Sequence, residues 1–158
     1  MPALACDPRA LVWSDGSFRP TGDLQEHGAW LSVNPAAKQK RGLLSGRIIV
    51  GFNVGRRRVW TLARLMKLVR QLRLAQGAAP SAPFLAQHGI YRHDAGAIGT
   101  EKGAQVILFN FGGLKLEDFA AKMLGLAKEV AIRFKQESVY VEIQKDGRQV
   151  EFWRVVPE

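Results

Sequence analysis

Three consecutive arginines, Arg56, Arg57 and Arg58, lie between an apolar segment and a segment with helical periodicity. The amino end of a helix already carries partial positive charge, so added cations there are unfavourable unless they meet an anion. Guanidinium groups bind phosphate and carboxylate through charge-assisted hydrogen bonds. In extended backbone, Arg56 and Arg58 would point to one side and Arg57 to the other. The run predicts an anion-binding site, assisted by the backbone amides at the helix start near Thr61.

Two asparagines lie in apolar segments that are predicted to be strands, although asparagine is depleted in strands. Asn53 belongs to the segment 47–54, and Asn110 belongs to the segment 104–111. We expect these two strands to be neighbours that run parallel, which would place both amides side by side near the carboxyl ends. Paired amides predict a polar site that orients a ligand by hydrogen bonds.

Three further polar side chains are expected to approach this site from the flanking strands. Tyr140 begins the strand predicted for 138–144, and Gln87 or His88 lies within the strand predicted for 84–93. The predicted ligand-binding residues are therefore Arg56, Arg57, Arg58, Asn53, Asn110, Gln87, His88 and Tyr140. Two structural alternatives remain open. The asparagines would cap the backbone of an N-terminal segment that covers this face, or the arginines would pair with Asp15, Asp23 or Glu26 and hold that segment down.

Other catalytic and metal-binding patterns are missing from the sequence. His88 and His93 are five residues apart and would face opposite sides of a strand, so they do not form a metal pair. No H-E-x-x-H, G-x-S-x-G or phosphate-loop motif occurs. Cys6 has no histidine near it in the sequence. We therefore expect no catalytic set, no metal and no cofactor.

Composition favours one basic globular chain with an anionic partner. The chain has 158 residues, a hydrophobic content of 47% and a formal net charge of +9. Such a charge favours nucleic acid, a nucleotide or another anion. A single cysteine and the lack of a long apolar run or signal peptide predict a cytoplasmic protein without a membrane span.

The elements that would position these side chains follow from hydrophobic periodicity. Strands are predicted at 47–54, 84–93, 104–111, 138–144 and 149–156, and helices at 62–76 and 117–136. The order β-α-β-β-α-β with an extra C-terminal strand predicts an α+β, ferredoxin-like sandwich with strand order 4-1-3-2. We assign this domain to residues 47–158. Residues 1–46, rich in proline and glycine, are predicted to form an irregular N-terminal arm packed on or near the sheet.

Both helices are expected to cover one face of the sheet and to leave an open face. In the first strand Ile48, Val50, Phe52 and Val54 should face the helices, which leaves Ile49, Gly51 and Asn53 on the open face. In the fourth, Tyr140, Glu142 and Gln144 should lie on the open face. In the third, Ile107, Phe109 and Phe111 are assigned to the helices, and Val106, Leu108 and Asn110 to the open face.

Three fragments carry a resemblance to known proteins: "GFNVG" followed by "WT", "FLAQHGIY" and "RFKQESVYVEI". They resemble small uncharacterised α+β proteins of bacteria and their phages, over roughly residues 48–144. The resemblance implies the fold and carries no functional residue.

The leading hypothesis is a non-catalytic accessory protein that binds an anionic ligand, with nucleic acid or a nucleotide first. The first alternative is a small-molecule enzyme that uses the open face, with Tyr140, His88 and Glu142 handling protons. The second is a protein-interaction or inhibitor module of a phage or mobile element. A homodimer through an edge strand or the open face is possible in either alternative.

Overall fold

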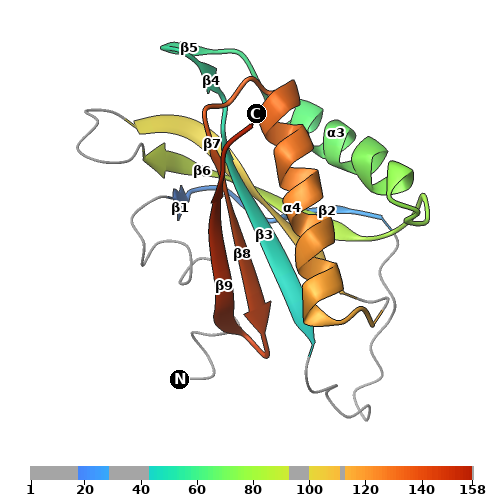
Figure 1. Ribbon diagram of the computed structural model, residues 1–158. Coiled ribbons are helices and arrows are strands. Elements are labelled where there is room, and N and C mark those ends of the chain that lie inside the picture. The colour runs from blue at the N-terminus through green and yellow to red at the C-terminus, as the bar shows by residue number, and fades with distance from the viewer. Residues whose placement is uncertain (1–17, 29–42, 93–99, 111–112, 158) are drawn as a thin grey trace.

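The computed structural model describes residues 18–28, 43–92, 100–110 and 113–157, and it is an α+β structure with a curled antiparallel sheet (Figure 1). Its strands are β1 (Phe18–Pro20), β2 (Gln25–His27), β3 (Leu44–Gly51), β4 (Asn53–Val54), β5 (Arg57–Arg58), β6 (Phe84–Arg92), β7 (Thr100–Phe109), β8 (Val139–Lys145) and β9 (Arg148–Val155). Its helices are α3 (Leu62–Ala75) and α4 (Leu116–Arg133).

The main sheet has the order β1-β6-β7-β3-β8-β9, and β2 also pairs with β6. Its four central strands, β8-β3-β7-β6, therefore lie in the predicted order 4-1-3-2. The prediction that the first and third strands run parallel is wrong, because β3 and β7 are antiparallel. The crossover through α3 keeps β6 in the direction of β3, and the antiparallel pairing of β6 with β7 then reverses β7.

Both helices begin and end close to where their sequence signals predict. Thr61 is the N-cap of α3, and its hydroxyl accepts a hydrogen bond from the Arg64 amide at 3.3 Å. Gly77, with a φ of +91°, follows the end of α3. The first turn of α4 carries Glu117 and Asp118, which stabilise the positive end of the helix dipole.

The core lies between the helices and one face of the sheet. Three of the residues predicted to face the helices, Ile48 and Val50 of β3 and Phe52 after it, are buried there. The fourth, Val54, lies instead in the hairpin of β4 and β5 and is not part of the core. The faces predicted for β7 are exchanged. Val106 and Leu108 were assigned to the open face, but they belong to this core. Side chains alternate along a strand, and the last four residues of β7, 106–109, are apolar on both faces, so their pattern alone does not show which set faces the helices.

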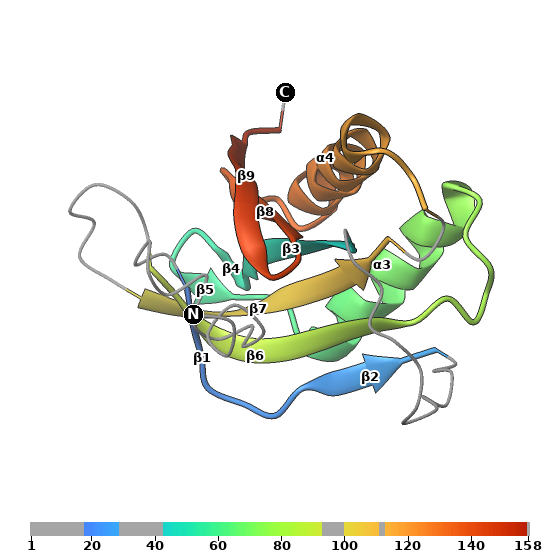
Figure 2. The same cartoon turned by 90° about the horizontal axis from the view of Figure 1, so that it is seen from below.

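The sheet is strongly twisted. In Figure 1 β6 runs nearly across the view while β8 and β9 run nearly vertically, and Figure 2 shows β8 and β9 close to end-on. Both helices lie on the same face in these views, and the hairpin of β4 and β5 projects beyond one end of the sheet. Asp146 and Gly147, both with positive φ, form the predicted turn between β8 and β9.

Most of the predicted N-terminal arm, residues 1–17 and 29–42, lies outside the described residues, as does the predicted turn at Asp15 and Gly16. Its described part contributes β1 and β2, which pair with β6. No helix in the described part of the chain is long and apolar enough to cross a membrane.

Candidate functional site

The three arginines lie in the hairpin of β4 and β5 rather than at the start of α3. Arg57 and Arg58 pair with Val54 and Asn53, whereas Arg56 lies in the turn beside Gly55, whose φ is +64°. The predicted alternation of Arg56 and Arg58 is therefore wrong, because the turn interrupts the extended backbone. All three arginines are exposed.

The two asparagines are not neighbours, because antiparallel strands place them at opposite ends of the sheet. The backbone amide of Asn110 donates to Leu44 O at the start of β3, whereas Asn53 follows the end of β3. The Asn110 side chain forms two hydrogen bonds with Leu114, of 2.7 and 3.0 Å, and so closes the loop before α4. The prediction that the asparagines form one paired site is therefore wrong.

Gln87 and Tyr140 do share a face, the open face that carries no helix. Gln87 is the cross-strand partner of Gln105, and Tyr140 is that of Ile49. His88, the next residue after Gln87, faces the other way and is exposed, with its ring edge-on to Phe52 at 6.2 Å. Gln87 and Tyr140 therefore lie in one row of this face, through Gln105 and Ile49, and neither Gln87 nor His88 pairs with Asn110.

The open face carries a set of buried polar side chains, here called the polar layer. Its members are Arg47, Gln87, Glu101, Gln105, Glu142 and Gln144. Each occupies the strand position that alternates with core residues, and none is more than 5% exposed. Burying polar and charged groups is costly, so such a layer at the centre of a sheet indicates a functional surface.

An amide chain crosses the polar layer. Gln105 Nε2 donates to Gln87 Oε1 at 2.7 Å, and Gln87 Nε2 donates to Gly22 O at 2.5 Å. Gln105 is fully buried, and its Oε1 accepts no hydrogen bond. A buried acceptor of this kind can bind an N–H group of a ligand at little desolvation cost.

Two carboxylates occupy the same layer. Glu142 lies across from Arg47 in the register of β3 and β8, and its Oε1 accepts a hydrogen bond from Gln144 Nε2 at 2.8 Å. Glu101 Oε2 accepts a hydrogen bond from the backbone amide of Asn53 at 2.5 Å. Because Asn53 pairs with Arg58, the arginine hairpin begins directly beside the Glu101 carboxylate.

Glycines leave room on this face. Gly51, Gly103 and Gly89 are cross-strand partners in one row across β3, β7 and β6. The Glu101 carboxylate fills the space over Gly51, and the Phe18 ring fills the space over Gly89. A side chain at either glycine would collide with these groups.

An apolar cluster borders the polar layer. Phe18, Ile49 and Tyr140 are buried together, and Phe152 packs against them. The Tyr140 and Phe152 rings stack with their centroids 5.6 Å apart. The face therefore combines carboxylates, amides and aromatic surface, which suits a ligand with a cationic part and a flat ring.

The site residues predicted from the sequence do not include Glu101, Arg47 or Gln105. Glu101 lies between two glycines and before the strand predicted to begin at residue 104, whereas β7 begins at Thr100. The available signal was the spacing of Glu101 and Gln105, which are four residues apart and so lie on the same face of a strand. Among the described residues, no group of three histidine, cysteine or acidic side chains could hold a metal.

Comparison with solved structures gives two similar chains. A phage SAM lyase in complex with S-methyl-5'-thioadenosine is 37% identical, with a TM-score of 0.67, over 79% of this chain and 98% of that chain. The apo form of a phage SAM lyase is 38% identical, with a TM-score of 0.65, over 77% of this chain and 98% of that one. No protein-family model and no curated protein matches. The expected resemblance to small α+β phage proteins is confirmed at this coarse level.

Proposed function

The chain belongs to the phage SAM lyase family, and we propose that it cleaves S-adenosylmethionine and releases S-methyl-5'-thioadenosine. One observation carries the proposal. The chain is 37% identical to a lyase of this kind and aligns with 98% of it. Similarity of fold alone would not carry an activity, but this level of identity along nearly the whole neighbour does.

The leading hypothesis from the sequence, a non-catalytic protein that binds nucleic acid, is wrong. The similar structures are enzymes that act on a small molecule, which was the first alternative. The net charge of +9 favours association with anions in general and does not identify a binding site.

The bond that must break is the one between the sulfonium sulfur and the γ-carbon of the amino-acid chain. Its electron pair stays on sulfur, which becomes the neutral thioether of S-methyl-5'-thioadenosine. A lyase adds no water, so the γ-carbon must be satisfied from within the substrate. Either the substrate carboxylate closes a ring on it, with no proton lost, or a neighbouring C–H bond breaks to give an alkene and a proton.

Positive charge on sulfur disappears during this reaction, so a carboxylate close to sulfur would stabilise the substrate more than the transition state. An apolar environment around sulfur is favourable for the same reason. The substrate ammonium keeps its charge throughout. We propose that Glu101 binds this ammonium, and that the cluster of Tyr140 and Phe152 contacts the adenosine part. The buried polar layer beside that cluster supports this arrangement.

The predicted ligand-binding residues take more specific roles in this proposal. Arg58 lies beside Asn53, which contacts Glu101, and so suits the substrate carboxylate. Gln87 supports Gln105, whose free acceptor suits an N–H group of the adenine. The ferredoxin-like assignment and a homodimer through the β9 edge or the open face stay proposals. The strand order β8-β3-β7-β6 supports the first.

The test is direct. Purified protein is incubated with S-adenosylmethionine, and the products are separated by liquid chromatography with mass detection. We expect S-methyl-5'-thioadenosine to accumulate in proportion to protein concentration and S-adenosylmethionine to decrease equally. Decay no faster than in buffer, or the appearance of S-adenosylhomocysteine in place of the thioether, would reject the proposal.

A further inference from the structure

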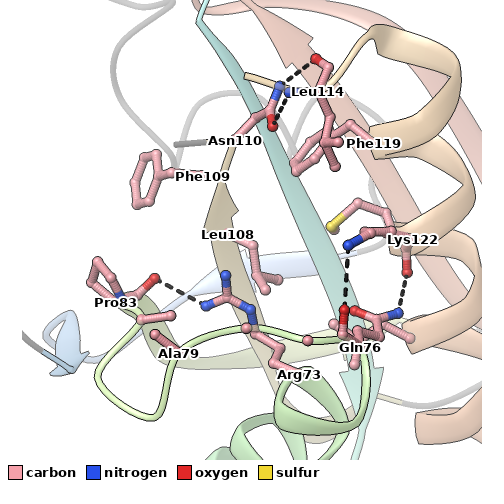
Figure 3. A pocket seen from close by; sticks show the side chains of 15 residues that line it. Arg73, Gln76, Ala79, Pro83, Leu108, Phe109, Asn110, Leu114, Phe119 and Lys122 are labelled. Atoms are coloured by element: carbon pink, nitrogen blue, oxygen red, sulfur yellow. Dashed lines mark hydrogen bonds between the residues drawn. The ribbon is translucent and has the colours of Figure 1, made fainter. Parts of the chain in front are cut away.

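A cavity lies on the helix side of the sheet, between the end of α3, the start of β6 and the first half of α4. Its volume is about 310 Å³, at the lower end of the range for small-molecule pockets. Figure 3 shows Arg73 reaching across it, with Pro83 on one side, Gln76 and Lys122 on the other, and Leu108 beside its guanidinium. Leu108 belongs to the helix side of β7, whereas Gln105 of the polar layer lies on the opposite face.

Two cations line the cavity, and none of the described residues that line it is acidic. Arg73 is half-buried, and burial lowers the pKa of its guanidinium. Its Nη1 atom donates to Pro83 O at 3.2 Å, and Lys122 Nζ donates to Gln76 O at 3.4 Å. Lys122 is exposed at the rim of the cavity, so Arg73 is the half-buried cation inside it and Lys122 adds a solvated positive charge at its edge.

The positive field extends beyond the cavity. The pKa of His27 lies below its ordinary value because of burial first, and then because of the charges of Arg70 and Arg73. The arginines that disfavour a proton on His27 would favour an anion in the same region.

The rest of the lining is apolar. Leu108, Phe119, Met123 and Leu126 form part of the wall, and the Asn110 amide is already bonded to Leu114. This wall suits a hydrocarbon or aromatic body, while the cations suit one acidic head group.

We propose that this cavity is a second binding site, for a small organic anion that has a carboxylate head and an apolar body. It goes beyond the proposed lyase activity and does not depend on it. S-Adenosylmethionine has a carboxylate but also a sulfonium and an ammonium group, and its net positive charge is unfavourable beside Arg73 and Lys122. Arg73 and Lys122 bind the carboxylate, and the wall that includes Leu108 and Met123 receives the apolar body.

The test uses hexanoate and its neutral analogue hexanamide as probes, with binding followed by amide chemical shifts in NMR. We expect hexanoate to shift residues of α3, α4 and the end of β7 and to bind about tenfold more tightly than hexanamide. Arg73→Gln and Lys122→Gln should each weaken hexanoate binding about tenfold. Arg64→Gln and Lys128→Gln, which remove exposed cations from the same two helices, should leave it unchanged.

Arg73→Lys distinguishes an effect of charge on hexanoate binding from an effect of altered folding, because it keeps the positive charge while it changes the hydrogen bond to Pro83. We expect it to retain most of the hexanoate affinity. The proposal is overturned by the absence of saturable shifts at millimolar hexanoate, by equal affinities for hexanoate and hexanamide, or by shifts confined to the open face. Lyase turnover is measured separately, so its presence or absence does not decide this result.

Discussion

The carboxylate of Glu101 occupies the space that a side chain at Gly51 would need. A β-carbon added to Gly51 would lie 2.5 Å from Glu101 Oε1 and 2.8 Å from Oε2. The same carboxylate accepts a hydrogen bond from the Asn53 amide, two residues beyond Gly51 along the chain. The end of β3 is thus shaped to hold one acidic group in one place, and this arrangement leads to the first prediction.

Gly51→Ala should displace the Glu101 carboxylate and lower lyase turnover by roughly 100-fold, as expected for a misplaced group near the reaction. Overpacking should also lower the free energy of unfolding by about 1 to 3 kcal/mol. Turnover assays and chemical denaturation measure the two effects. Gly125→Ala is the control, because a β-carbon there would meet only Gln76 Nε2, at 3.9 Å, and an alanine in α4 should stabilise by about 0.5 to 1 kcal/mol. Full activity in Gly51→Ala would contradict the role given to Glu101.

The amide chain of Gln87 and Gln105 should behave as one unit. Gln105→Met leaves Gln87 Oε1 buried without its donor and should cost about 1 to 3 kcal/mol of unfolding free energy. The double variant Gln87→Met with Gln105→Met should cost less than the sum of the single variants. Urea denaturation of the four proteins completes the cycle. Strict additivity would mean that the two amides do not interact in solution.

Arg56→Ala combined with Arg58→Ala should leave the melting temperature nearly unchanged, because both side chains are exposed. We expect the KM for S-adenosylmethionine to rise about tenfold while kcat changes less, since Arg58 lies beside the Glu101 site. A fall of several degrees, with faster proteolysis near the N-terminus, would instead support the alternative in which the arginines pair with acidic residues of the N-terminal arm and hold it down. Lys128→Ala, a change at an exposed cation of α4, is the control for nonspecific charge effects.

His27 should titrate below its ordinary pKa of 6.5, and Arg73→Gln should raise that value by removing a nearby positive charge. NMR titration of the imidazole measures both. The unfolded chain binds the proton more readily than the folded one, so stability due to this group is present above pH 6.5 and decreases as pH falls through 6.5 toward the folded value. If the pKa of His27 is the same in Arg73→Gln as in the control variant Arg64→Gln, the His27 imidazole and the Arg73 guanidinium do not interact.

Much of the fold was predictable from local signals. Thr61 and Gly77 marked the ends of α3, and the Asp146–Gly147 turn marked the last hairpin, because caps and turns depend on a few neighbouring residues. The relative direction of β3 and β7 could not be predicted from local signals, because it depends on the crossover through α3 and on the pairing of β6 with β7. Because β3 and β7 were predicted to run parallel, Asn53 and Asn110 were expected to share one site, whereas they lie at opposite ends of the sheet.

The site was less predictable than the fold. Tyr140 and Glu142 were placed correctly because β8 alternates strictly between the core and the open face. Glu101 was lost because glycines, which usually indicate turns, here make room for a side chain inside the sheet. That role depends on cross-strand neighbours, which a single sequence does not contain.

Turnover of S-adenosylmethionine by Glu101→Gln tests the central claim most directly. The substitution keeps the shape of the side chain and removes the charge that we assign to the substrate ammonium. Glu129→Gln is the matched control, because Glu129 is a partly exposed acidic residue of α4, which lies on the opposite side of the sheet from the polar layer. We expect release of S-methyl-5'-thioadenosine by the wild type and Glu129→Gln at similar rates, and a decrease of roughly 100-fold in Glu101→Gln with an unchanged melting temperature. Equal rates in all three proteins would contradict the assignment of the site to this face of the sheet.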